Sequence, residues 1–240
     1  MSARIGFIKT SIMEVLQEGI AAVDCMQDGG LETFPMLEYT LQSIFLKMTG
    51  YGEQKLRFII WEIASYDLEF RYNLLKGEYS FGEFSQLCDK KKVYVKLRKE
   101  ISTFINTDIF TDDVKNHILQ EVREEMNLIF EHSALKNAFP NEYERFLAFL
   151  TTWNADSFAK GNELLRDNLV PFYSEYVYKL RNRCAHNTLS YQQDYLGFED
   201  MQKPYMVYAN YFTCFALLLL LDKIFVYLFK SFERQVELNI

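Results

Sequence analysis

Residues 205–236, YMVYANYFTCFALLLLLDKIFVYLFKSFERQV, form the most apolar stretch of the chain and decide its predicted fold. Large apolar side chains recur there every three or four residues, the spacing of an α-helical face. They are Tyr208, Phe212, Phe215, Leu218, Leu219, Ile224, Leu228 and Phe232. So many apolar side chains need more partners than a surface helix has. We therefore expect this helix to pack centrally or against a second subunit.

The apolar run from Met206 to Leu221 also resembles a membrane-spanning segment, but two features argue against that interpretation. Asn210 lies near its start, and Asp222 and Lys223 follow it directly. The run is also shorter than the roughly 20 apolar residues that a spanning helix needs. We therefore predict a buried core helix and no membrane partner.

The rest of the chain predicts further helices and an all-α fold. Only 10 Gly and 4 Pro occur, and no stretch alternates apolar and polar residues over the length of a strand. Thr111 is a candidate N-cap, and Gly50 and Gly52 are expected to bracket a turn. We expect helices over 5–26, 35–48, 54–75, 84–105, 142–152 and 205–236, another after Thr111, and a long one from about Leu164 to Cys184 that Pro171 kinks. Residues 1–240 are predicted to form a single domain, with 77–140 as an inserted elaboration.

Composition limits the classes of function. The formal net charge of −7 argues against a protein that coats nucleic acid non-specifically, although basic clusters occur at Lys90 to Lys99 and at Lys179 to Arg183. We interpret the first cluster as a solvated helix face. The first 20 residues lack the continuous apolar run of a signal peptide, so we predict a cytoplasmic protein.

The cysteines and histidines predict neither a metal site nor a cofactor. The cysteines, Cys25, Cys88, Cys184 and Cys214, are far apart and form no Cys-x-x-Cys pair, which is typical of free thiols in a reducing cytosol. His117 and Glu121 are one helical turn apart, but no third ligand lies near them, and His132 is isolated.

The polar stretch YKLRNRCAHN, residues 178–187, is the main candidate site. On a helix Asn182 and His186 lie on one face, with Arg181 and Arg183 on its flanks. A guanidinium binds phosphate bidentately, an imidazole can transfer a proton near neutral pH, and a carboxamide both donates and accepts hydrogen bonds. The same residues also suit a solvated helix end, where cations offset the macrodipole and Asn187 tolerates the cap conformation.

The run Arg181-Asn182-Arg183-Cys184-Ala185-His186 resembles the signature of the HEPN superfamily, in its abortive-infection (Abi-type) branch. In that family the signature lies at the end of a late helix, a loop follows, and another apolar helix completes a four-helix bundle. The resemblance covers mainly residues 162–232 and implies a HEPN-like helical bundle. The subset paired with a nucleotidyltransferase antitoxin carries Tyr two residues after the His, where this chain has Thr188, so we do not expect that partner.

The resemblance implies a metal-independent endoribonuclease that acts as a toxin or antiphage effector. Arg181 would bind the scissile phosphate, Asn182 would orient the substrate or the imidazole, and His186 would be the general acid/base. Arg183, Asn187 and Lys179 are candidate RNA-binding residues beside them. Its partners would be RNA, a second copy that brings two motifs together, and a cognate antitoxin or regulator.

A different class of protein also fits these residues. A non-catalytic helical interaction module could use the polar cluster as a helix cap or a binding contact. In that case Arg181 and His186 would lie apart, or would be engaged with backbone groups and buried carboxylates.

Overall fold

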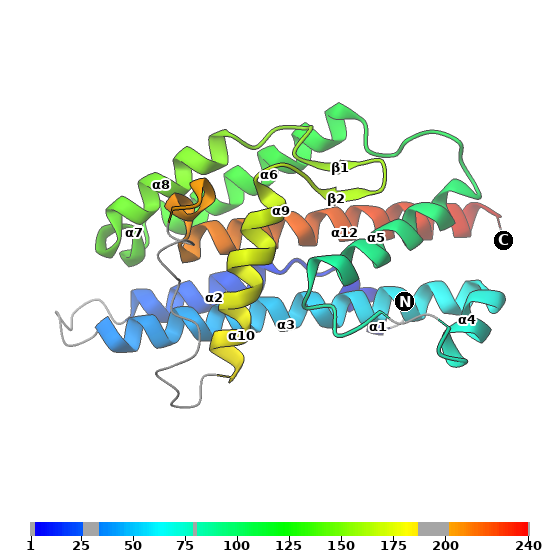
Figure 1. The fold of residues 1–240 in the computed structure, drawn as a ribbon, viewed down its shortest axis with the longest axis horizontal. Coiled ribbons are helices and arrows are strands. Elements are labelled where there is room, and N and C mark those ends of the chain that lie inside the picture. Colours follow the sequence, from blue (N-terminus) through cyan, green and yellow to red (C-terminus); the bar gives the residue numbers. More distant parts are fainter. Residues whose placement is uncertain (1–2, 26–33, 79–80, 187–201, 240) are drawn as a thin grey trace.

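The protein is an elongated helical bundle in which two long helices lie along its length (Figure 1). The computed structural model describes residues 3–25, 34–78, 81–186 and 202–239. Helix α3 (Phe34–Tyr66) packs against α12 (Tyr211–Asn239), with α2 (Met13–Asp24) on α3 and with α6 (Asp112–Phe130) and α8 (Pro140–Thr151) on α12. The predicted all-α class is confirmed, because the structure is 77% helical with two short strands.

Helix α12 is the central element of the core, as its apolar sequence predicts. Almost every side chain from Phe212 to Ile224 is buried, and the helix packs against α1, α3, α5, α6 and α8. Among the described residues it is the one helix long and apolar enough to cross a membrane, yet 83% of its most apolar window is buried inside the protein. The helix begins at Tyr211, and not at Tyr205, because a separate 3-10 helix, η3 (Pro204–Tyr208), precedes it.

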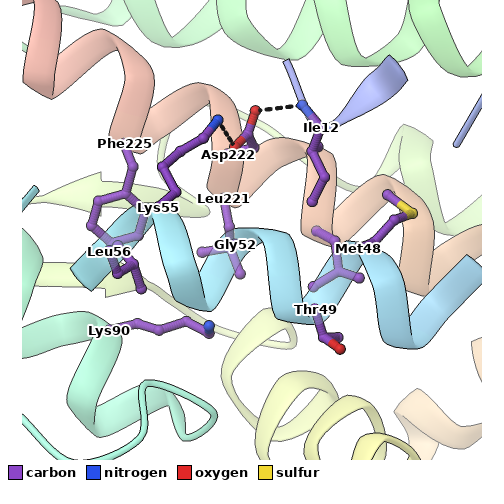
Figure 2. Close-up of a pocket in the computed structure, with 11 residues that line it drawn as sticks. Ile12, Met48, Thr49, Gly52, Lys55, Leu56, Lys90, Leu221, Asp222 and Phe225 are labelled. Atoms are coloured by element: carbon purple, nitrogen blue, oxygen red, sulfur yellow. Dashed lines mark hydrogen bonds and ion pairs between the residues drawn. The ribbon is translucent and has the colours of Figure 1, made fainter. Parts of the chain in front are cut away.

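The N-terminal segment forms two helices where the sequence predicts one over 5–26. α1 (Ala3–Lys9) ends before a short break, and α2 follows it. Two buried charges satisfy the backbone at this break: Lys55 on α3 donates to the Thr10 carbonyl at 2.7 Å, and Asp222 on α12 accepts from the Ile12 N–H at 3.0 Å. Lys55 and Asp222 also form an ion pair with each other, which Figure 2 shows.

Helix α3 runs without a break through Gly50 and Gly52, so the predicted turn there is wrong. Both glycines lie in the middle of a 33-residue helix whose apolar side chains pack on α2 and α12. Tertiary packing therefore overrides the low helix propensity of glycine. The break comes instead at Asp67, whose side chain accepts from the Phe70 N–H and begins α4 (Leu68–Leu75).

Because of this geometry, we expect Gly50→Ala to raise the free energy of unfolding by about 0.8–1.0 kcal/mol, the difference in helix propensity between the two residues. Gly50 is exposed, and an added Cβ meets no atom within 4 Å. Urea unfolding measures the change. Gly19→Ala is the contrasting variant, since its Cβ would lie 2.3 Å from Ile44 Cγ1. A lower unfolding midpoint for Gly50→Ala would contradict the prediction.

The segment 77–140 contributes to the same core as the rest of the chain. Helix α5 (Leu87–Ser102) packs on α3 and α12, and α6 packs on α12. The predicted cap at Thr111 is confirmed, because its side chain accepts from the Val114 N–H. Short helix α7 (Ala134–Ala138) then leads into α8, whose first residue is Pro140.

The long helix expected from Leu164 to Cys184 is divided. Leu164 belongs to a short hairpin, β1 (Phe158–Lys160) and β2 (Glu163–Leu165), so the prediction of helices alone is incomplete. The turn uses Gly161 at φ 56°, and three-residue strands are too short to show alternation. The chain continues as α9 (Leu169–Pro171), a π-helix η2 (Phe172–Val177) and α10 (Tyr178–His186).

Candidate functional site

The candidate residues lie on α10, which packs against α3 and η2. Arg181 to Cys184 are half-buried, whereas His186 is exposed. The polar, turn-rich stretch 187–204 predicts a loop after the candidate motif, and Gly29-Gly30 predicts the end of the first helix. Asn187, nearly all of that stretch and both glycines lie outside the described residues. Of the candidate residues, Lys179, Arg181, Asn182, Arg183 and His186 can therefore be placed.

Arg181 is held by a carboxylate of α3. Its Nη2 lies 3.3 Å from Glu53 Oε2, and its Nη1 donates to the Asn182 side-chain oxygen at 3.4 Å. The Arg181 side chain is 19% exposed and that of Glu53 is 9% exposed, so little water screens the pair. The guanidinium is thus fixed in orientation while part of it remains open to solvent.

Glu53 was not predicted as a site residue, because 128 residues separate it from Arg181. The sequence places it directly after Gly52, where we expected a turn. Charge alone does not single Glu53 out, because the same helix also carries charged side chains at Glu38, Lys47, Lys55, Arg57 and Glu62. Charged side chains at such positions are almost never buried unless they are paired.

Lys90 and Tyr173 lie close behind Glu53 and Arg181. Lys90 is fully buried on α5 and donates to the Phe84 carbonyl at 2.7 Å. Burial lowers the pKa of Lys90 to about 8, while the negative charge of Glu53 opposes that shift and the positive charge of Arg181 adds to it. The Tyr173 hydroxyl donates to the Ser85 carbonyl at 2.9 Å, and burial raises its pKa well above the ordinary value.

The interpretation of Lys90 to Lys99 as one solvated face is therefore wrong for its first residue. Lys90 points inward and lines a cavity of about 30 Å³, enough for a water molecule, together with Lys55 and Asp222. Figure 2 shows Lys90 approaching α3 from α5. Lys91, Lys92 and Lys99 are exposed, whereas Lys96 and Arg98 are half-buried and form ion pairs.

The buried ammonium of Lys90 predicts that the free energy of unfolding rises with pH between about 8 and 10. An unfolded lysine has a pKa of about 10.4, so in this range the unfolded chain binds more protons than the folded protein. The expected contribution is up to about 1.4 kcal/mol per pH unit. Below pH 8 both states carry the proton, and this slope disappears.

Urea unfolding of the wild type and of Lys90→Met, at steps from about pH 7 to about pH 9.5, measures this contribution. The wild type should gain stability relative to the variant as the pH rises. Above about pH 10 the raised pKa of Tyr173 acts the other way, since unfolded tyrosines lose their protons first. Parallel curves for the two proteins would show that Lys90 keeps its proton in the folded state throughout.

His186 lies apart from Arg181. The two residues are five positions apart on α10, which places them roughly 140° apart around the helix axis. Asn182 is four positions from His186 and shares its face, as predicted. Arg181 therefore faces α3 and Glu53, while His186 lies at an exposed position at the end of the described part of α10.

The other two basic residues of α10 have different surroundings. Lys179 forms an ion pair with Glu175 at 3.0 Å, and Lys203 lies 3.9 Å from the same carboxylate. Arg183 is half-buried near Tyr176, where its positive charge opposes the burial that raises the pKa of the phenol. Lys179 is thus the more accessible cation, and Arg183 lies toward the interior.

No group of three potential metal ligands occurs in the described part of the chain. His117 Nδ1 lies 3.9 Å from Glu121 Oε1, and both side chains are exposed. The cysteine thiols are free, with Cys25 and Cys88 exposed, Cys184 half-buried and Cys214 buried.

A scan against protein-family models finds no matching family, and searches of the curated proteins and of the solved structures give no significant match. The function must therefore be inferred from the residues and contacts described above.

Proposed function

We propose that the protein is a metal-independent endoribonuclease of HEPN type, which acts in the cytoplasm as a toxin or an antiphage abortive-infection effector. The observation that carries the proposal is the Glu53–Arg181 ion pair together with the exposed His186, which lies five residues further along the same helix. A guanidinium has five N–H donors. In Arg181, one N–H of Nη2 is directed at Glu53 and one N–H of Nη1 at Asn182. The remaining donors can bind a phosphate without reorientation.

The proposed reaction uses the nucleophile that RNA itself carries. The 2′-oxygen attacks the adjacent phosphorus, a base removes its proton, and the bond from phosphorus to the 5′-oxygen breaks. A proton passes to the departing 5′-oxygen, leaving a 2′,3′-cyclic phosphate and a 5′-hydroxyl. His186 performs these proton transfers, and Arg181 offsets the negative charge that develops on the phosphoryl oxygens.

A homodimer would bring the guanidinium of Arg181 and the imidazole of His186 together. Within one chain, Arg181 and His186 point in directions roughly 140° apart. A twofold interface along α10 would place Arg181 of one copy near the partner's His186 and form two equivalent sites. Lys179 and Arg183, with Asn187, would then bind the RNA backbone on either side. A cognate antitoxin or regulator could act by blocking this interface.

The basic experiment incubates the purified protein with a mixed cellular RNA pool in EDTA and determines the chemical ends of the products. Cleavage with 2′,3′-cyclic phosphate and 5′-hydroxyl ends supports the proposal. Sedimentation at micromolar protein tests the dimer. A strictly monomeric protein that still cleaves RNA would contradict the shared site while leaving the nuclease in place.

The second candidate is a non-catalytic interaction module, and the Glu53–Arg181 pair also favours it. Arg181 is engaged by a nearly buried carboxylate of its own chain, which is what a structural contact requires. On this alternative the ion pair holds α10 against α3, and the exposed residues of α10 form a contact surface. An absence of cleavage together with stable dimerisation would favour this candidate.

A further inference from the structure

A cavity of about 200 Å³ lies next to α10, formed by residues of α3, α7, α8, η2 and the start of α12. Glu38, Phe139, Tyr176 and Tyr211 contribute its polar and aromatic lining. The cavity lies close to the candidate motif, because Tyr211, which lines it, is near enough to Cys184 of α10 to oppose the burial that raises the pKa of that thiol. Arg183 lies close enough to Tyr176 for its charge to act on the phenol.

The size of the cavity limits its occupant. Pockets for drug-sized ligands typically measure about 300–1,000 Å³, so this one suits a single planar ring system and not a whole nucleotide. The charge of the lining limits the occupant further. Glu38 and Glu142 are both carboxylates, and the cavity lining includes no lysine or arginine. These two carboxylates disfavour a phosphate or other anion, although Arg183 acts on Tyr176 from nearby, and they can accept hydrogen bonds from an uncharged group with N–H donors.

Glu38 presents one carboxylate oxygen with open acceptor capacity. Its Oε1 accepts from the Tyr211 hydroxyl at 2.9 Å and from the Gln42 side chain at 3.1 Å. Among the described residues no donor reaches Oε2. A carboxylate oxygen has two lone pairs, so Oε2 can accept two N–H groups that lie side by side. Because Tyr211 and Gln42 fix the carboxylate, a ligand would meet it in a set orientation.

The aromatic side chains complete the features of a base-binding pocket. Tyr176 and Tyr211 line the cavity together with Phe139. Proteins that bind single-stranded RNA stack unpaired bases on such rings and read the Watson–Crick edge by hydrogen bonds. Of the four RNA bases, guanine carries two adjacent donors on that edge, N1–H and the N2 amino group. Adenine, cytosine and uracil each present one donor group there.

We propose that this cavity binds an unstacked guanine base of the substrate RNA, with Glu38 accepting from N1–H and N2–H and Tyr176 and Tyr211 contacting the ring. The proposal rests on the endoribonuclease function, because the neighbouring α10 would then cleave beside the bound guanosine. Guanine recognition would give the enzyme a sequence preference at a position fixed relative to Arg181 and His186.

Binding of free nucleosides tests the pocket without reference to cleavage. Guanosine, adenosine, cytidine and uridine are titrated into the wild type and into Glu38→Gln by calorimetry or ligand-observed NMR. The wild type should bind guanosine at least about tenfold more tightly than the other three nucleosides. Glu38→Gln should lose that preference, because an amide replaces one acceptor oxygen with a donor, and it should gain affinity for adenosine.

Two further variants separate recognition from folding. Glu38→Asp keeps the carboxylate and should retain part of the guanosine preference. Glu144→Gln makes the same change of charge at an exposed position on α8 and should bind guanosine like the wild type. Equal binding of all four nucleosides by the wild type, or unchanged guanosine binding by a folded Glu38→Gln, would overturn the proposal.

Cleavage mapping on RNAs of defined sequence then separates this inference from the proposed function. Selective guanosine binding without any RNA cleavage would support the guanine pocket and contradict the proposed endoribonuclease activity. Cleavage at sites unrelated to guanine, unchanged by Glu38→Gln, would support the endoribonuclease activity and contradict guanine recognition by the cavity. With both correct, the wild type cuts beside guanines and Glu38→Gln cuts with an altered base preference.

Discussion

Asp222→Ala should lower the free energy of unfolding by about 3–5 kcal/mol, the cost of removing one partner of a buried ion pair. The Lys55 and Asp222 side chains are 1% and 3% exposed. Burial lowers the pKa of Lys55 and raises the pKa of Asp222, because loss of water disfavours both charged forms. Each charge therefore depends on the other for compensation. The substitution also leaves the Ile12 N–H without its acceptor.

Chemical denaturation of Asp222→Ala beside Asp112→Ala measures this effect. Asp112 pairs with Lys115 at 3.5 Å but is 81% exposed, so its loss should cost at most about 1 kcal/mol. The double variant Lys55→Met/Asp222→Leu removes both charges and should recover most of the lost stability. Asp222→Ala with the same stability as Asp112→Ala would mean that Lys55 finds another partner or loses its charge.

Loss of RNA cleavage in His186→Ala and Arg181→Ala is the other large effect that we expect. Removing a general acid/base typically lowers a rate by about 10²–10⁴-fold. Removing a positioned donor to a developing oxyanion costs about 10²–10³-fold. Both variants are assayed in EDTA against His132→Ala, in the turn before α7, and Arg166→Ala, directly after β2. Those two controls should cleave like the wild type.

Arg181 needs a second variant, because its removal leaves Glu53 nearly buried without a partner. Arg181→Lys keeps the positive charge beside Glu53 and should fold, yet an ammonium cannot bind phosphate bidentately, so cleavage should still fall. Full activity in folded His186→Ala would show that His186 is not the general acid/base. Full activity in Arg181→Lys would reduce the role of Arg181 to packing α10 against α3.

The local features of the fold were predictable where a short segment determines them. The cap at Thr111, the helix predicted over 142–152, which the structure begins at Pro140, and the burial of α12 follow from neighbouring residues alone. The break between α1 and α2 was not predictable in this way. It depends on Lys55 and Asp222, which are far from it in sequence and satisfy its backbone groups only after the helices pack.

The same limit applies to the candidate site. Residue types and helical spacing place Asn182 and His186 on one face and identify the basic residues of α10. The partner of Arg181 could not be predicted, because Glu53 lies on a helix in which Gly50 and Gly52 predict a turn. The hydrogen bonds that fix the Glu38 carboxylate likewise require Tyr211, which is 173 residues away.

The π-helical turn η2 sets the angular position of everything that follows it. A π-turn holds one residue more than an α-turn, and each residue advances a helix by roughly 100°. If residues 172–177 wound as an ordinary α-helix, α10 would be rotated by about that angle and Arg181 would no longer face Glu53. The one extra residue of the π-turn thus sets the direction in which the side chains of α10 point. Deletion of a single codon there would turn Arg181 and His186 to other directions while leaving the sequence of the motif unchanged.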